Sequence, residues 1–244
     1  MKPVYNKNYG KWFVNDVLKA ISRYRMIDSG EKISVALSGG KDSITLLYIL
    51  KYINDFSHLK FELSAIHVKT FSDYNTDILK EYCNQLEIPY FETILESEKE
   101  VPKKSICYLC SRLKRGAISS ILKEKGIKKV CFGHHANDVA ETLLMNMIEN
   151  KKLGSFSPRV EISENEPIIL RPMVYLEEAI INSLHKNHNL PLLEEVCMYG
   201  YCNNRSKYKK LILQMEEAIE QKSISASITK SLENLDYTNI WRQS

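Results

Sequence analysis

The sequence predicts an α/β protein built on a parallel sheet, and three observations support this fold class. Short β-prone runs alternate with helical patterns up to about Gly154, which is typical of βαβ units. A glycine turn follows the first of these runs and leads directly into a helical pattern. The 244 residues are 44% hydrophobic and 26% charged, an ordinary balance for a globular chain with one sizeable core.

The expected elements follow in a regular order. Apolar residues at helical spacing predict a first helix from Tyr9 to Met26, and Ile33 to Leu37 is a β-prone run. The later strands are expected at residues 61–68, 89–94, 129–132 and 168–170. The later helices are expected at residues 44–53, 76–86, 111–125, 137–148, 176–188 and from 207 onward. We therefore expect a helical N-terminal lead (1–30), one α/β domain (31–202) and a helical C-terminal appendage (203–244).

The first glycine turn has the composition of a phosphate site. Gly39 and Gly40 allow a tight turn in which backbone N–H groups converge on an anion, next to a helix N-terminus. Ser38 and Ser43 can donate hydrogen bonds, and Lys41 can neutralise negative charge. Neither a Walker A loop nor a G-x-G-x-x-G motif is present. The alternative is a glycine C-cap followed by a capped helix.

This turn resembles the PP-loop of N-type ATP pyrophosphatases, whose domain is Rossmann-like (adenine nucleotide alpha hydrolase-like). The resemblance implies cleavage of ATP between its α and β phosphates, with an adenylated intermediate and pyrophosphate as products. The residues that it places on ATP here are Ser38, Gly39, Gly40, Lys41, Asp42 and Ser43.

A second glycine turn begins at Gly133, where a predicted strand ends and a helix begins. Ligands of open α/β sheets bind at the carboxyl ends of the strands, so this turn should face the phosphate turn. Asp138 and Glu141 share a helix face and could hold Mg²⁺ or orient Lys41; helix capping and a zinc pair of His134 with Asp138 are alternatives.

The segment from Gly133 to Thr142 resembles the G-H-x-x-D-D-x-x-E-T signature of PP-loop tRNA-modifying enzymes, with Asn137 in place of the first Asp. The resemblance adds Gly133, Asp138 and Glu141 to the ATP site and makes Lys41 and Asp138 the expected catalytic residues.

Six cysteines form two pairs and two single thiols. Cys107 and Cys110, at i and i+3 ahead of a predicted helix, can both reach one metal ion or cluster. Zinc, a redox disulfide and inert packing are the alternatives. Cys83 and Cys131 stand in apolar surroundings and are expected to be buried packing thiols.

The stretch Cys107–Gly116, together with Leu170-Arg171-Pro172-Met173 and both glycine turns, resembles the tRNA 2-thiocytidine synthetase family from about Trp12 to Cys197. The resemblance implies a 4Fe–4S cluster held by Cys107, Cys110 and Cys197. The last pair is C-x4-C where the family has C-x-x-C, which leaves Cys197 and Cys202 as alternatives for the third ligand.

Positive charge is concentrated in one stretch. Nine basic residues and one acidic residue lie between Lys103 and Lys129, a net charge of +8 in a chain of +4. Such a block suggests a polyanionic partner, and a solvated helix face is the alternative. The resemblance implies that this partner is tRNA. The residues expected to contact it are Arg112, Lys114, Arg115 and Arg171. His67, at a strand end, is expected either in the adenine pocket or in packing.

The resemblance implies an ATP-dependent tRNA sulfurtransferase that forms 2-thiocytidine in the anticodon loop. ATP would adenylate the C2 oxygen, and sulfur from sulfide or a persulfide carrier would displace AMP. The alternatives are a PP-loop sulfurtransferase for another tRNA position or a small molecule, and a non-catalytic nucleotide-dependent Fe–S or RNA-binding module. With neither a bilayer-length apolar run nor a secretory pattern, the expected location is cytoplasmic. Family members are often dimers, so a homodimer is also expected.

Overall fold

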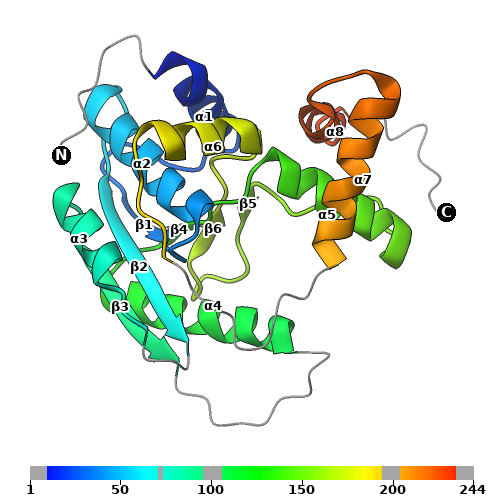
Figure 1. The fold of residues 1–244 in the computed structure, drawn as a ribbon. Helices are drawn as coiled ribbons and strands as arrows, with labels where there is room; N and C mark the ends of the chain where they lie inside the picture. The colour runs from blue at the N-terminus through cyan, green and yellow to red at the C-terminus, as the bar shows by residue number, and fades with distance from the viewer. Residues whose placement is uncertain (1–9, 71–73, 96–105, 194–203, 235–244) are drawn as a thin grey trace.

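A computed structural model describes residues 10–70, 74–95, 106–193 and 204–234. Its centre is a six-stranded sheet of order β3-β2-β1-β4-β6-β5 (Figure 1). The strands are β1 (Lys32–Ala36), β2 (Glu62–Thr70), β3 (Tyr90–Leu95), β4 (Lys129–Cys131), β5 (Arg159–Val160) and β6 (Ile168–Leu170). All neighbouring strands run parallel except β5, which pairs antiparallel with β6.

The order of the strands locates the expected ligand crevice. From β1 the chain builds outward through β2 to β3, and it then returns to place β4 on the other side of β1. The direction of winding therefore reverses between β1 and β4, and in open α/β sheets ligands bind at the carboxyl ends of the strands beside such a switch point. Both glycine turns follow these two strands directly.

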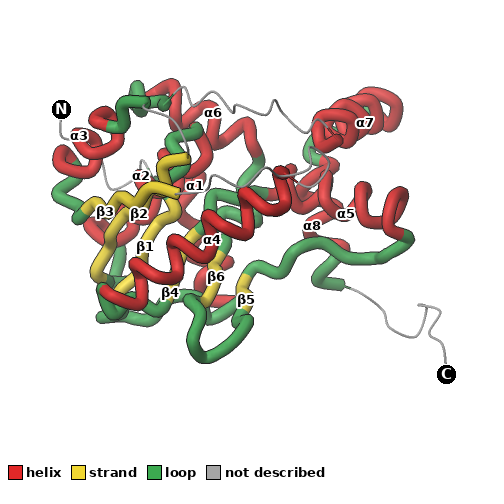
Figure 2. Tube along the Cα trace, turned by 90° about the horizontal axis from the view of Figure 1, so that it is seen from below, coloured by secondary structure: helices red, strands yellow, loops and turns green. Residues whose placement is uncertain are grey.

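Helices cover both faces of the sheet (Figures 1 and 2). One face carries α1 (Lys11–Arg23), α2 (Lys41–Phe56), α3 (Asp77–Gln85) and α6 (Glu178–Asn187), which share the large apolar core with the sheet. The opposite face carries α4 (Ile106–Glu124), whose Ile118 and Leu122 pack on Ile66 and Val130. Because apolar side chains cover both faces, the parallel strands read as nearly continuous apolar runs.

Three helices lie together to one side of the sheet (Figure 1). They are α5 (Ala136–Asn150), α7 (Asn204–Ile219) and α8 (Ile224–Ser231), which pack on one another around Ala140, Ile212 and Ile224. Since α5 begins at the second glycine turn, this packing attaches the C-terminal helices to the crevice side of the sheet. The predicted domain boundaries at residues 30 and 202 stay predictions.

The predicted α/β class and order of elements are confirmed, with two differences. The helix expected from Ser111 begins at Ile106, so Cys107 and Cys110 lie within its first turns and not ahead of it. The apolar spacing after Ser111 therefore located the helix but not its first turn. The short strand β5 was missed, because two residues are too few to show an alternating pattern. No helix in the described ranges is long and apolar enough to cross a membrane.

Candidate active site

A cleft of about 520 Å³ lies at the switch point. Both glycine turns line it, together with β2, α4 and the end of β6. Nine of its lining residues were predicted from the sequence to contact ATP or RNA: Ser38, Asp42, Ser43, His67, Lys114, Arg115, Gly133, Asp138 and Arg171. The tertiary structure therefore brings together residues that are up to 133 positions apart, as the resemblance implied.

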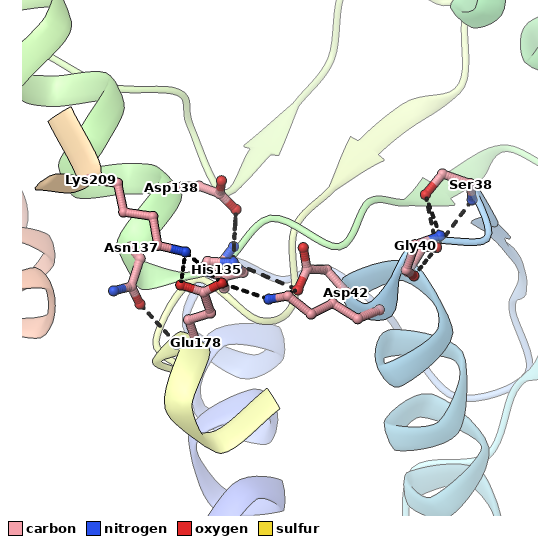
Figure 3. Close-up of polar contacts among 10 residues, drawn as sticks. Ser38, Gly40, Asp42, His135, Asn137, Asp138, Glu178 and Lys209 are labelled. Atoms are coloured by element: carbon pink, nitrogen blue, oxygen red, sulfur yellow. Dashed lines mark hydrogen bonds and ion pairs between the residues drawn. The ribbon is translucent and has the colours of Figure 1, made fainter. Parts of the chain in front are cut away.

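The phosphate turn is held by its own two serines (Figure 3). The Ser43 hydroxyl donates to the Gly40 carbonyl at 2.9 Å and accepts the backbone N–H of Ser38 at 3.1 Å. The single hydroxyl proton of Ser43 is thus used, so Ser38 donates the 3.0 Å hydrogen bond between the two hydroxyls. Gly39 has φ +87°, a conformation that favours glycine, and α2 starts at Lys41. The first N–H groups of α2 therefore face an anion position at a helix N-terminus.

The two glycine turns touch each other through Gly133. A Cβ atom at this position would lie 2.9 Å from the backbone carbonyl carbon of Asp42 and 3.0 Å from the Ser43 nitrogen. Only a residue without a side chain lets the turn after β4 approach the start of α2 so closely. This contact explains physically why glycine is needed at the position that the sequence motif marks.

Two carboxylates from different helices converge on one buried imidazole (Figure 3). His135 Nε2 lies 3.5 Å from Asp138 Oδ2 and 3.8 Å from Asp42 Oδ1. Asp138 also accepts the backbone N–H of His135 at 3.0 Å, so it caps α5 and lines the cleft at once. Glu141 is buried in α5 and does not line the cleft.

Asp42 and Asp138 supply oxygen ligands of the kind that Mg²⁺ prefers, and both line the cleft that holds the phosphate turn. The donor chemistry therefore fits a Mg²⁺ ion that accompanies ATP. Among the described residues, no group of three or more His, Cys, Asp or Glu side chains is arranged around a single metal position. A Mg²⁺ ion would accordingly share its coordination with phosphate oxygens and water.

Lys41 is held by a carboxylate that the sequence analysis did not identify. Its Nζ donates to Glu178 Oε1 at 2.7 Å and to Asp42 Oδ1 at 3.1 Å. Burial opposes the charged form of Lys41, but these hydrogen bonds and negative charges outweigh it and raise its pKa. Lys41 therefore remains a cation at neutral pH, as charge neutralisation of phosphates requires. Nothing in the local sequence marked Glu178, because it lies 137 positions away at the start of α6.

His67 links the ends of two strands. Its Nδ1 lies 2.7 Å from the Leu37 carbonyl, which can only accept, so this nitrogen carries the proton. Its Nε2 lies within hydrogen-bond distance of the Tyr74 hydroxyl, at 3.1 Å. The ring is buried, as the packing expectation requires, and it also lines the cleft; its place in an adenine pocket stays a prediction.

Arg171 is fixed on three sides at the end of β6. Its Nε donates to His134 Nδ1 at 3.3 Å, one terminal nitrogen donates to the Ser157 carbonyl at 2.6 Å, and the guanidinium stacks on Phe156 at 4.8 Å. Burial, together with the charge of Arg115, lowers the pKa of Arg171 to about 10. Arg171 is thus a charged, preoriented wall of the cleft at neutral pH.

Three basic residues of α4 line two neighbouring hollows. Lys114 and Arg115 line the cleft itself, whereas Arg112 lines a neighbouring groove of about 320 Å³. Cleft and groove share four residues, namely Arg115, Ile118, Phe132 and Ile169. A positively charged path therefore runs along α4 into the cleft.

The cysteines fall into two chemical groups. Burial raises the pKa of the Cys83 thiol to about 12. Burial also raises the pKa of Cys131 to about 12, against the opposing charge of Lys129, so both thiols stay protonated at neutral pH. Cys110 is half-buried one helical turn from Cys107 at the start of α4, beside the cleft-lining Ser111. A pair at this spacing fits a cluster. The side chain of Cys107, and Cys197 and Cys202 altogether, lie outside the described residues.

The chain approaches the phosphate turn just before the segment that contains Cys197. Leu193 donates its backbone N–H to the Gly39 carbonyl at 3.0 Å. A Cβ atom on Gly39 would lie 2.6 Å from Leu193 Cβ, so the two segments are in direct contact. Cys197 follows four residues later in the sequence.

Comparison with known proteins agrees with this geometry. Residues 11–215 match the family described as the PP-loop domain. The chain is 37% identical over 210 residues to a tRNA-cytidine(32) 2-sulfurtransferase of Syntrophotalea carbinolica, covering 82% of this chain and 81% of the relative. It is 31% identical over 246 residues to the protein of the same name from Geobacter sulfurreducens, covering 96% and 93%.

A solved structure shares the fold. It is the U34-tRNA thiolase NcsA of Methanococcus maripaludis with its 4Fe–4S cluster, with a TM-score of 0.76 and 22% identity over 96% of this chain and 83% of that one. The fold, the two glycine turns at its switch point and the two sequence relatives lead to one assignment. The chain belongs to the PP-loop family and, within it, to the tRNA 2-thiocytidine synthetase-like proteins.

Proposed function

We propose that this protein is an ATP-dependent tRNA sulfurtransferase that converts a cytidine of the anticodon loop, position 32 in the relatives' name, to 2-thiocytidine. One observation supports this function above all others. A single cleft contains the phosphate turn, the second glycine turn and the basic residues of α4, and the helix that carries Cys107 and Cys110 starts beside it. Nucleotide, RNA and sulfur chemistry would thus meet in one place.

In the first step, the C2 oxygen of the cytidine attacks the α-phosphorus of ATP and pyrophosphate leaves. Lys41 and the first N–H groups of α2 would neutralise and orient the phosphates, and Asp42 and Asp138 would hold the accompanying Mg²⁺. In the second step, sulfide attacks C2 and AMP departs with the former C2 oxygen. Catalysis is therefore mostly positioning and charge compensation, and we propose Lys41 and Asp138 as the catalytic residues.

Cys107, Cys110 and Cys197 are the residues that we propose to hold a 4Fe–4S cluster. Three protein ligands leave one iron available to bind sulfide, which is the chemistry that such a cluster would supply. The protonated, buried thiols of Cys83 and Cys131 are not part of this set. The sulfur would come from sulfide or from a persulfide carrier.

We propose that tRNA binds along α4. Arg112, Lys114 and Arg115 lie on this helix and Arg171 closes the cleft, so phosphates of a folded RNA would meet fixed positive charge. We also propose a cytoplasmic location, where tRNA and ATP are available, and a homodimer. Exposed Met147 and Ile148 on α5, with Leu213 and Ile219 on α7, supply apolar surface for a dimer contact.

The test is anaerobic purification followed by a visible spectrum, iron and sulfide analysis, and a pyrophosphate assay with and without tRNA. We expect broad absorbance near ~400 nm that is lost in Cys107→Ala and Cys197→Ala. Cys83→Ala is the matched control, since it removes a thiol that is not a proposed ligand. Pyrophosphate should form only with a tRNA that carries cytidine at position 32. A colourless protein carrying zinc or no metal would exclude the cluster chemistry and leave only ATP-dependent activation.

A further inference from the structure

The C-terminal helix α7 reaches the phosphate site through one carboxylate (Figure 3). Lys209 Nζ lies 2.9 Å from Glu178 Oε1 and 2.6 Å from Oε2, while Lys41 donates to the same Oε1 at 2.7 Å. Two ammonium groups from opposite ends of the chain therefore share one oxygen of Glu178. The Glu178 side chain is only 17% exposed, so solvent screens this network less than it screens an ordinary surface pair.

Glu178 itself is held in place by its backbone. Its N–H donates to Asn137 Oδ1 at 2.8 Å, so α5 caps the start of α6. Asn137 is the residue that replaces the first Asp of the sequence signature, and its amide oxygen performs this capping without a charge. The neighbouring Glu177 accepts from the Ser223 hydroxyl at 3.1 Å, so α8 is tied to the same point.

The network defines the charge that ATP meets. Glu178 and Asp42 take two of the three N–H donors of Lys41, and within the described part of the chain the third has no recorded partner. The carboxylate of Glu178 would by itself weaken the attraction of Lys41 for phosphates. Lys209 offsets that negative charge from the other side, since it pairs with the same carboxylate.

We propose that Glu178 is a positioning residue for Lys41 and that Lys209, on the C-terminal appendage, completes the electrostatics of the ATP site. This inference rests on the proposed function, in which Lys41 neutralises the phosphates of ATP. It assigns to α7 a part in nucleotide binding that its position, 168 residues after Lys41, does not suggest. Neither Glu178 nor Lys209 needs to touch ATP for this role.

The experiment is a double-mutant cycle on affinity for α,β-methylene-ATP with Mg²⁺, measured by calorimetry without tRNA. Lys209→Met should weaken binding about three- to tenfold, because Glu178 is then balanced by Lys41 alone. In the Glu178→Gln background, where no negative charge remains to be offset, the same Lys209→Met change should alter affinity less than about twofold. In turnover with tRNA, Lys209→Met should raise KM for ATP with little change in kcat, whereas Glu178→Gln should lower kcat.

The control is Lys210→Met, which removes the same charge from the next residue of α7, an exposed position with no ion pair to Glu178 in the structure. Additive effects of the two substitutions, or equal effects of Lys209→Met and Lys210→Met, would overturn the inference. If Glu178→Gln does not fold, the affinities of Lys209→Met and Lys210→Met for the ATP analogue still test the inference. If Lys209 and Glu178 are coupled in analogue affinity but the protein transfers no sulfur to tRNA, the inference stands and the proposed thiolation is refuted. If the wild-type protein does not bind the analogue, the inference and the proposed function are both refuted.

Discussion

A single methyl group on Gly133 tests whether the contact between the two glycine turns positions the nucleotide. In Gly133→Ala the new Cβ would lie 2.9 Å from the Asp42 carbonyl carbon, against the 3.4 Å or more of ordinary contacts. The neighbouring atoms belong to the backbone of the phosphate turn, so the turn must shift by several tenths of an ångström. Gly133 does not have a positive φ, so the cost is steric and does not come from backbone strain.

Overpacking of this kind costs about 1–3 kcal/mol of unfolding free energy. For a chain of this size that corresponds to a fall in Tm of about 2–12 °C. A shift of several tenths of an ångström in the phosphate turn should also weaken binding of α,β-methylene-ATP, by about two- to tenfold. Differential scanning fluorimetry and calorimetry measure the two effects on the same sample.

Gly116→Ala is the matched control for this substitution. It adds the same methyl group within α4, where no atom beyond the adjacent residues and the helix's own backbone lies within 4 Å of the new Cβ. Replacing a helical glycine by alanine should stabilise the protein by up to about 1 kcal/mol. A Gly133→Ala variant that melts and binds nucleotide like the wild type would refute the claim that these turns position each other.

Three further predictions follow from the site and the core. Arg171→Lys should lower the rate of tRNA-dependent pyrophosphate formation by about ten- to a hundredfold, because a lysine cannot reproduce the donor fork to His134 and Ser157; unchanged steady-state kinetics would contradict this. Burial raises the pKa of Glu178, but hydrogen bonds from Lys209 and Lys41 outweigh it and bring the pKa to about 2 from an ordinary 4.5. A carboxyl group whose pKa is lowered by folding stabilises the fold above pH 4.5, and this contribution is lost as the pH falls toward 2. The difference in unfolding free energy between wild type and Glu178→Gln, measured by urea titration, should therefore close over this pH range. A difference that does not change with pH would exclude the linkage. Cys83 and Cys131 should resist a thiol reagent at pH 8 in the native protein and should react once the protein is unfolded in urea. Mass spectrometry of the labelled peptides measures both, and rapid labelling of either cysteine in the native protein would contradict its burial.

Local sequence patterns sufficed for much of the fold. Most strands and helices of the alternating pattern, the phosphate turn after β1 and the second turn after β4 could each be recognised from its own short run of residues. The short strand β5 could not be recognised in this way, because it has only two residues and depends on its pairing with β6. The start of α4 was placed five residues late, because apolar spacing locates a helix better than it locates its first residue.

The sequence by itself determined the fold class, the family resemblance and the candidates on the two glycine turns, because backbone freedom at glycine and apolar periodicity are local properties. Only the tertiary structure decided that Lys41 is held by Glu178, that Lys209 joins them from α7, and that Gly133 touches the backbone of Asp42. Each of these contacts joins residues that are between 31 and 137 positions apart in the sequence. Strand order and helix packing set such pairings, and no periodicity along a single segment encodes which distant partner a charged side chain will meet.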